Sequence, residues 1–149
     1  MKSELVEYAV TFLRFILAFV FIIAAADKIS DPAAFAQSIE NYRVFPIWSV
    51  NIIALFIPWL EIYTGVLLIS GTAVRENLII IGLLLIAFII LVLSAVFRDL
   101  NIDCGCFGTS NAQKVGFYKV IENSVLLVIA RIVYRFGPGK FYLKRNGND

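Results

Sequence analysis

Four long apolar stretches, separated by short polar segments, dominate the hydrophobic pattern of this chain. They cover residues 8–26, 50–70, 78–97 and 117–136, and each is close to the roughly 20 residues that cross a bilayer as a helix. The third stretch has no charged residue, whereas the fourth carries charges towards both ends. Helices satisfy their own backbone hydrogen bonds in lipid, so the pattern predicts a single all-α domain, an integral membrane four-helix bundle.

A short amphipathic helix is predicted between the first and second stretches. Ser30-Asp31-Pro32 combines a capping side chain with a proline at the first helical position. Phe35, Ile39 and Tyr42 then recur at helical spacing, so we expect a helix over residues 33–42 that lies at the membrane interface. At the other end of the chain, the polar segment 140–149 is expected to be a disordered tail.

Composition supports a membrane protein and excludes nucleic-acid binding. The 149 residues are 60% hydrophobic, well above the roughly 45–50% of soluble domains. Mean hydropathy is +0.87 and the net charge is +2, without a basic run that would attract nucleic acid. Lys140, Lys144 and Arg145 cluster after the fourth stretch. Positive residues favour the cytoplasmic side, so we expect both termini in the cytoplasm and the loop between the third and fourth stretches outside.

The first stretch has an alternative interpretation as a cleaved signal peptide. Ala24-Ala25-Ala26 resembles a small-residue cleavage site. Glu4 and Glu7 dilute the positive start of the chain, and Arg14 interrupts an apolar stretch that is long for a signal peptide. We therefore expect the first stretch to be retained as a membrane span.

Two charged residues fall inside the first and second apolar stretches. Arg14 and Glu61 are expected near mid-membrane on antiparallel helices, where charged side chains usually face the bundle interior and pair. Lys28 continues the stripe that contains Arg14, and Trp59 lies on a face adjacent to Glu61. Two interpretations remain open. One is an Arg14–Glu61 ion pair that only fixes helix register. The other is a polar pocket, with Arg14, Lys28, Trp59 and Glu61 as candidate residues, for a proton path or a small redox lipid such as a quinone.

A second acidic residue lies near the outer end of the fourth stretch. Glu122 follows the preceding loop closely and has three candidate roles. It could pair with Lys119 at the interface, pair with Lys28 across the bundle, or accept protons beneath the loop.

That loop contains the two cysteines of the chain, Cys104 and Cys106, separated by Gly105. The chain has no histidine, which excludes imidazole bases and histidine-containing haem or zinc sites. A one-residue spacer permits a strained disulfide, and strained, exposed disulfides are the labile or catalytic ones. A purely structural disulfide would add little stability, because the loop that it closes is so short. A zinc site would need further ligands from a second copy of the chain. Two inert thiols are the remaining alternative, so thiol–disulfide chemistry without a metal is the leading prediction.

A set of charged, aromatic, proline, glycine and cysteine positions extends through most of the chain. They are Arg14, Asp27-Lys28, Asp31-Pro32, Phe35, Tyr42, Pro46, Pro58-Trp59-Leu60-Glu61, Gly65 and Gly71, followed by Cys104-Gly105-Cys106-Phe107-Gly108. This combination resembles the DoxX-like membrane family, and the cysteine loop narrows the resemblance to its methylamine-utilisation branch, the MauE-type proteins. The resemblance implies a four-helix protein of the bacterial inner membrane that acts beside periplasmic thioredoxin-like partners. Such proteins are associated with maturation of a disulfide-rich dehydrogenase subunit.

The layout is also similar to the vitamin K epoxide reductase family, a four-helix bundle with a redox cysteine pair and a quinone beside it. This chain departs from that family because its cysteines have one intervening residue instead of two, and because it has no second, relay pair. Direct exchange between Cys104 or Cys106 and a partner's thiols is therefore expected. The leading hypothesis is a membrane thiol–disulfide oxidoreductase that uses a quinone. The alternative is a non-catalytic scaffold that docks a thioredoxin-like protein, and a transporter is a weaker third option because the chain shows no internal repeat.

Overall fold

The computed structural model describes residues 2–98 and 117–139, and this part of the chain is helical apart from short connections. The predicted cysteine loop and the predicted disordered tail lie outside the described residues. The helices are α1 (Lys2–Ser30), α2 (Pro32–Asn41), α3 (Ile47–Ser70), α4 (Val74–Phe97) and α5 (Phe117–Phe136). The prediction of an all-α fold is confirmed.

The predicted apolar stretches correspond to the four long helices. The bounds of α5 agree with the predicted range, while α3 and α4 begin a few residues earlier than predicted. The first helix, α1, extends beyond its apolar stretch at both ends and takes in polar residues such as Glu7 and Lys28. In the described part of the chain, α1, α3 and α4 are long and apolar enough to cross a membrane. The more polar α5, which carries Lys119, Glu122, Arg131 and Arg135, does not meet that standard.

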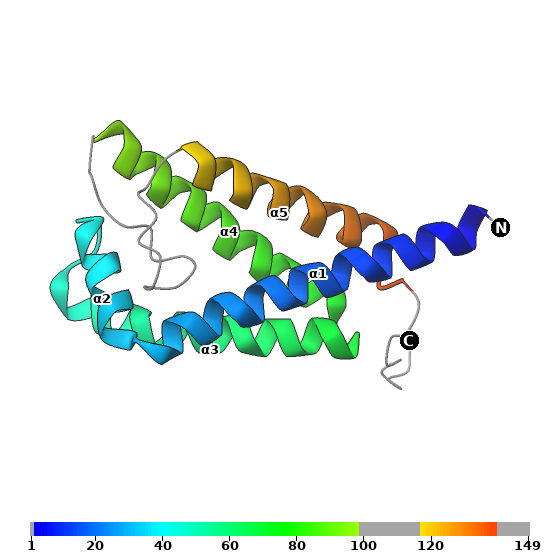
Figure 1. Cartoon of the computed structure of the whole chain (residues 1–149), viewed down its shortest axis with the longest axis horizontal. Helices are drawn as coiled ribbons and strands as arrows, with labels where there is room; N and C mark the ends of the chain where they lie inside the picture. Colours follow the sequence, from blue (N-terminus) through cyan, green and yellow to red (C-terminus); the bar gives the residue numbers. More distant parts are fainter. Residues whose placement is uncertain (1, 99–116, 140–149) are drawn as a thin grey trace.

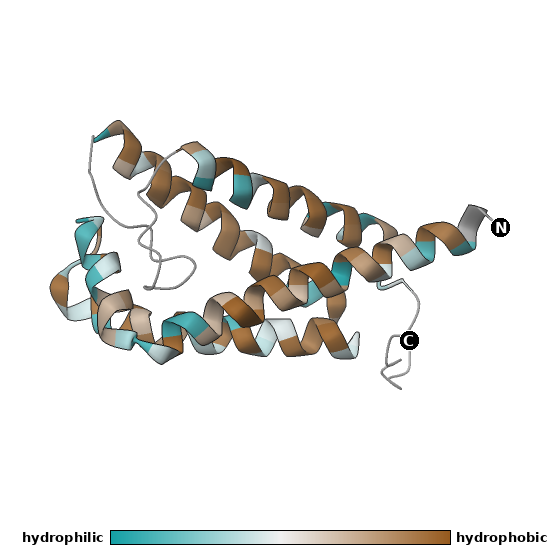
Figure 2. Cartoon of the chain, in the orientation of Figure 1, coloured by the Kyte–Doolittle hydropathy of each residue, from teal (hydrophilic) through white to brown (hydrophobic). Residues whose placement is uncertain are grey.

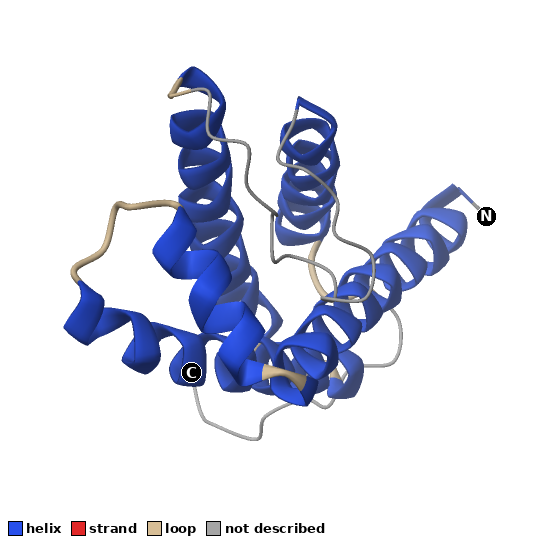
Figure 3. Ribbon diagram, turned by 60° about the vertical axis from the view of Figure 1, so that its left-hand side comes forward, coloured by secondary structure: helices blue, strands red, loops and turns tan. Residues whose placement is uncertain are grey.

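The long helices form two pairs, α1 with α3 and α4 with α5 (Figure 1). The pairs meet at one end, where the buried residues Leu17, Leu68, Ile81 and Val133 bring all four helices together. Towards the other end the pairs diverge, and α2 packs there against α3 (Figure 1). Figure 3 shows the same divergence from another direction. A bundle that is closed at one end and open at the other leaves room for a site beside α2.

The outward faces of the helices are strongly apolar (Figure 2). On α3 alone, Leu55, Phe56, Trp59 and Tyr63 are each at least 59% exposed. Soluble monomers rarely expose contiguous apolar surface on this scale, and such surface marks contact with a membrane or a partner. The exposed rings and aliphatic side chains are therefore consistent with helices that face lipid.

The short helix α2 begins where the sequence predicts. The Asp31 carboxylate accepts a hydrogen bond from the backbone N–H of Ala34 at 3.0 Å, and Pro32 occupies the first helical position. Phe35 and Ile39 are buried, and they pack with residues of α3 instead of facing outward. The apolar face that was expected to contact the membrane interface is thus largely covered by protein.

Close contact between α1 and α3 depends on a glycine. A Cβ added to Gly65 would lie 2.7 Å from Cγ1 of Ile22 and 3.1 Å from the carbonyl oxygen of Ala18. The first distance is too short for a real contact, so a side chain at position 65 would force Ile22 or the helices themselves to shift. This close approach is typical of membrane helices that pack through small residues.

We expect Gly65→Ala to lower the free energy of unfolding by about 1–3 kcal/mol, the usual cost of overpacking a dense core. Gly82→Ala is the matched control, because its added Cβ would meet the nearest side-chain atom, on Leu127, at 3.9 Å. Thermal unfolding of both variants in detergent measures the difference. Equal stability of the two variants would show that the α1–α3 approach can relax without cost.

Candidate functional site

The polar centre of the bundle is a bidentate ion pair between α1 and α3. The Lys28 ammonium donates to Oε1 of Glu61 at 2.6 Å and to Oε2 at 2.7 Å. Lys28 lies in the last turn of α1, and Glu61 lies one turn after Pro58 in α3. Both residues are buried, with 6% and 8% of their surface exposed. Because both carboxylate oxygens are bound by one ammonium, the two charges compensate each other inside the protein.

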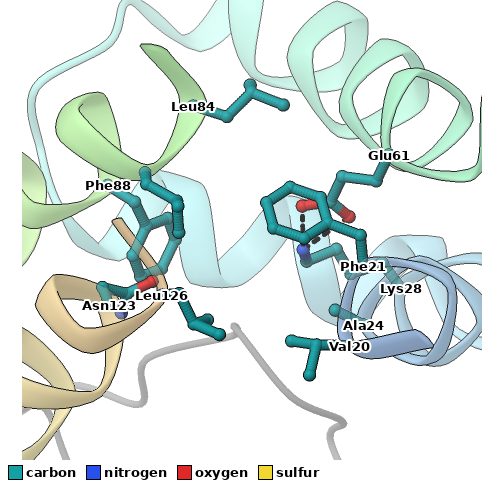
Figure 4. A pocket seen from close by; sticks show the side chains of 10 residues that line it. Val20, Phe21, Ala24, Lys28, Glu61, Leu84, Phe88, Asn123 and Leu126 are labelled. Atoms are coloured by element: carbon teal, nitrogen blue, oxygen red, sulfur yellow. Dashed lines mark hydrogen bonds and ion pairs between the residues drawn. The ribbon is translucent and has the colours of Figure 1, made fainter. Parts of the chain in front are cut away.

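Two adjoining cavities open beside this ion pair, and both are lined by Lys28, Glu61, Leu84 and Phe88. The larger cavity, of about 140 Å³, lies between the ion pair, α2, α3 and α4. The smaller one, of about 40 Å³, lies among α1, α4 and α5 and is bordered by Asn123. Figure 4 shows the ion pair facing Phe88 and Asn123 across the smaller cavity. The cavities occupy the region where the two helix pairs diverge.

One face of α2 lines the larger cavity with both polar and apolar groups. Ser38 donates its hydroxyl to the carbonyl of Ala34 at 2.9 Å, and Tyr42 is 3% exposed. Burial raises the pKa of the Tyr42 phenol far above its ordinary value, so this side chain remains neutral at physiological pH. The guanidinium of Arg98, directly after α4, donates to the carbonyl of Tyr42 at 2.9 Å. This bond joins the end of α4, directly before the cysteine loop, to a residue that lines the larger cavity.

The predicted Arg14–Glu61 pair is wrong. Glu61 binds Lys28, and Arg14 lies about four helical turns, or about 21 Å, before Lys28 on the same helix. Gly65 faces Ala18 and Ile22, which places Arg14 nearer to the end of α3 than to Glu61. The fully buried Arg14 instead donates to the carbonyl of Pro138 at 2.5 Å, and its guanidinium lies 5.3 Å from the Phe15 ring centre.

The predicted pocket residues are therefore divided in space. Lys28 and Glu61 are joined, whereas Arg14 lies far along α1 and Trp59 is 59% exposed on the outer face of α3. Neither Arg14 nor Trp59 lines the cavities beside the ion pair. A role for these residues in binding a cofactor stays a prediction.

A second ion pair lies at the start of α5, the first described helix after the cysteine loop. Lys119 and Glu122 are 2.7 Å apart, so Lys119, among the partners considered for Glu122, is the one observed. Lys119 is buried, and its backbone carbonyl accepts a hydrogen bond of 2.8 Å from the side chain of Asn123. A role for Glu122 in proton transfer stays a prediction. Cys104, Gly105 and Cys106 lie outside the described residues.

Sequence reasoning missed most of the cavity wall. Leu84 and Phe88 belong to α4, whose uniform apolar run gives no signal of which face is inward. Ser38 in α2 stands one turn before Tyr42, the residue that directly follows this helix, so the helical spacing of the segment could have indicated Ser38. Across residues 2–98 and 117–139 no group of three or more acidic, histidine or cysteine side chains is arranged to hold a metal ion.

Comparison with known proteins identifies the family. The family model described as "Methylamine utilisation protein MauE" matches residues 6–136. The MauE protein of Paracoccus denitrificans is 32% identical over 119 residues, which cover 79% of this chain and 64% of the relative. The MauE protein of Methylorubrum extorquens is 31% identical over 121 residues, which cover 80% of this chain and 65% of the relative.

This chain therefore spans a little under two thirds of the length of these two relatives. The MauE protein of Paracoccus versutus is 27% identical over 131 residues, which cover 87% of this chain and 69% of that relative. No solved structure matches the chain. The family match extends over α1 to α5 and includes the ion pair, the cavity walls and the cysteine loop, so the chain belongs to the MauE family of membrane proteins.

Proposed function

We propose that this protein serves methylamine utilisation as a membrane thiol–disulfide oxidoreductase that exchanges electrons with a periplasmic thioredoxin-like partner and a membrane quinone. The observation that carries the proposal is the cysteine pair. Cys104 and Cys106 are the two cysteines of a chain that has no histidine. The names of its relatives support the process, since each is called a methylamine utilisation protein. The substrate would be a disulfide-containing periplasmic protein that matures through the partner.

The chemistry balances as two transfers of an electron pair. A partner thiolate attacks the Cys104–Cys106 disulfide, which forms a mixed disulfide and frees one thiol on this chain. The partner's second thiolate then attacks the partner sulfur of the mixed disulfide, which forms the partner's own disulfide and frees the second thiol on this chain. The two thiols then give two electrons and two protons to a quinone, which re-forms the disulfide and leaves a hydroquinone. With the quinone as oxidant the partner becomes oxidised, and the same steps in reverse would deliver reducing equivalents from hydroquinone to the partner.

This function requires the cysteine loop to face the periplasm. We expect α5 to be a fourth span of the bacterial inner membrane, with both termini in the cytoplasm. The packing of α5 supports this expectation, because it lies against α4 and α1 and buries Lys119 and Asn123 inside the bundle. The position of Arg98 supports a role for the loop beside the cavity. Cys104 follows Arg98 by six residues, which span at most about 22 Å.

Single-cysteine variants test the proposal. With either Cys104→Ser or Cys106→Ser, the remaining thiolate can attack the disulfide of an oxidised thioredoxin-like partner. We expect this mixed disulfide to accumulate in cells and to disappear on reduction, because the second thiol of this chain, which would release the partner, is absent. The variant with both serines is the control and should trap nothing. Non-reducing electrophoresis followed by mass spectrometry identifies the adduct.

The same variants separate the oxidoreductase from the scaffold. An oxidoreductase needs both cysteines, so each single variant and the double variant should abolish growth on methylamine. A scaffold that only docks a thioredoxin-like protein needs neither cysteine. Normal growth of the double variant, with no trapped partner in the single variants, would overturn the redox role.

A further inference from the structure

The larger cavity has the size of a single aromatic ring. Its volume of about 140 Å³ is close to that of an engineered protein cavity of roughly 150 Å³ that holds benzene. Its walls are mostly apolar and come mainly from three helices, with Phe35 on α2, Ile57 on α3 and Leu84 on α4. An apolar cavity with few polar groups is the usual form of a small-molecule site.

The ion pair supplies this cavity with a hydrogen-bond donor. A lysine ammonium has three N–H groups, and Lys28 gives two of them to the carboxylate of Glu61. No further acceptor for Lys28 is found in the part of the chain that the structure describes. Its nitrogen lies 5.4 Å from the ring centre of Phe35, on the α2 wall of the cavity. A ligand oxygen in the cavity could therefore accept the third N–H.

The charges of the site select among ligands with such an oxygen. Glu61 compensates the charge of Lys28 at 2.6 Å, so the cavity offers a donor without a net positive charge. An anionic ligand would find the Glu61 carboxylate beside its binding partner and would be repelled. A neutral ring that carries a carbonyl oxygen matches both the apolar walls and the single donor. Among membrane-soluble molecules, this is the chemistry of a quinone.

We propose that the cavity bounded by α2, α3 and α4 binds the ring of a membrane quinone, with one carbonyl oxygen hydrogen-bonded to Lys28. This inference rests on the proposed function and assigns its acceptor site. The substituents of the ring extend between α3 and α4, where Ala87 borders the cavity and is exposed. The bond from Arg98 to Tyr42 joins the last described residue before the cysteine loop to a residue that lines the same cavity.

Matched probes test the site on purified protein in detergent. Duroquinone is a methylated single-ring quinone, and durene is the same methylated ring without the two carbonyl oxygens. Equilibrium titration should show that duroquinone binds at least tenfold more tightly than durene, because durene cannot accept the Lys28 N–H. Equal affinity for the two probes would overturn the assignment of Lys28 as the donor.

Cavity-filling variants locate the bound ring. Leu84→Trp should weaken duroquinone binding at least tenfold, whereas Leu83→Trp, at a neighbouring position that is 63% exposed, should leave it within twofold. Ala87→Phe also fills part of the cavity and should weaken duroquinone binding. This variant replaces Leu84→Trp in the test if Leu84→Trp lowers the melting temperature. Unchanged affinity in a folded cavity-filling variant would place the quinone elsewhere.

A last control keeps this inference separate from the proposed function. The double variant with Cys104→Ser and Cys106→Ser should bind duroquinone as tightly as the wild-type protein, because the site lies in the bundle. Quinone binding with no trapped partner would support the site while refuting thiol exchange. A trapped partner without duroquinone binding to the wild-type protein would refute the site and leave thiol exchange standing.

Discussion

Replacing Lys28 by methionine is expected to lower the free energy of unfolding by about 3–5 kcal/mol, the cost of stranding one member of a buried ion pair. In Lys28→Met the carboxylate of Glu61, 8% exposed, loses both of its bonds to the ammonium. Glu61→Met should cost a similar amount, because it leaves the ammonium buried instead. Thermal unfolding in detergent measures each loss.

The variant with both methionines should be more stable than either single variant, because it strands no charge. Well-packed apolar residues often replace a buried ion pair at little cost. Lys119→Met with Glu122→Met forms the matched control cycle, since the side chain of Glu122 is 29% exposed and its stranded charge can reach solvent. The interaction free energy of the control cycle should be smaller. Additive effects of Lys28→Met and Glu61→Met would contradict a tight ion pair.

The positions of the helices were predictable because their signals are local. Apolar runs of helical length define α3, α4 and α5, and the start of α2 depends on Asp31 and Pro32, which act within one turn. The bounds of α1 were predicted too short, since hydropathy marks the part that suits lipid whereas the helix continues through polar residues at both ends. In this chain, hydropathy therefore predicts that a helix is present but does not predict where α1 begins and ends.

The partners of the buried charges were not predictable, because they depend on helix register. The sequence places Arg14 and Glu61 at similar depths only if α1 and α3 are centred on each other. In the structure, α1 is displaced along α3 from that centred arrangement, so that Gly65 lies against Ala18 and Ile22. Lys28 is then within reach of Glu61. That register follows from the close fit of small residues between two helices, which no local pattern reports.

The cavity was even less accessible to sequence reasoning. It exists because the α1–α3 and α4–α5 pairs diverge towards α2, so its walls come from helices that are distant in the sequence. The uniform hydropathy of an apolar run such as α4 does not indicate which side chains line a cavity and which face lipid. Sequence reasoning could find the charged residues of the candidate site, but only the fold shows which of them border the cavity.

Replacing Arg14 by alanine is expected to cost about 3–5 kcal/mol, since it combines a core cavity with the loss of a charged hydrogen bond. Arg14 is fully buried, and its bond to the carbonyl of Pro138 holds the segment after α5 against α1. Arg14→Met keeps the apolar stem and should cost about 1.5–3 kcal/mol, the usual value of a hydrogen bond to a charged group. Arg135→Ala, at an exposed site in α5, is the control and should change stability little. If Arg14→Met unfolds at the wild-type temperature, the Pro138 contact contributes nothing, and packing alone explains why an arginine is buried there.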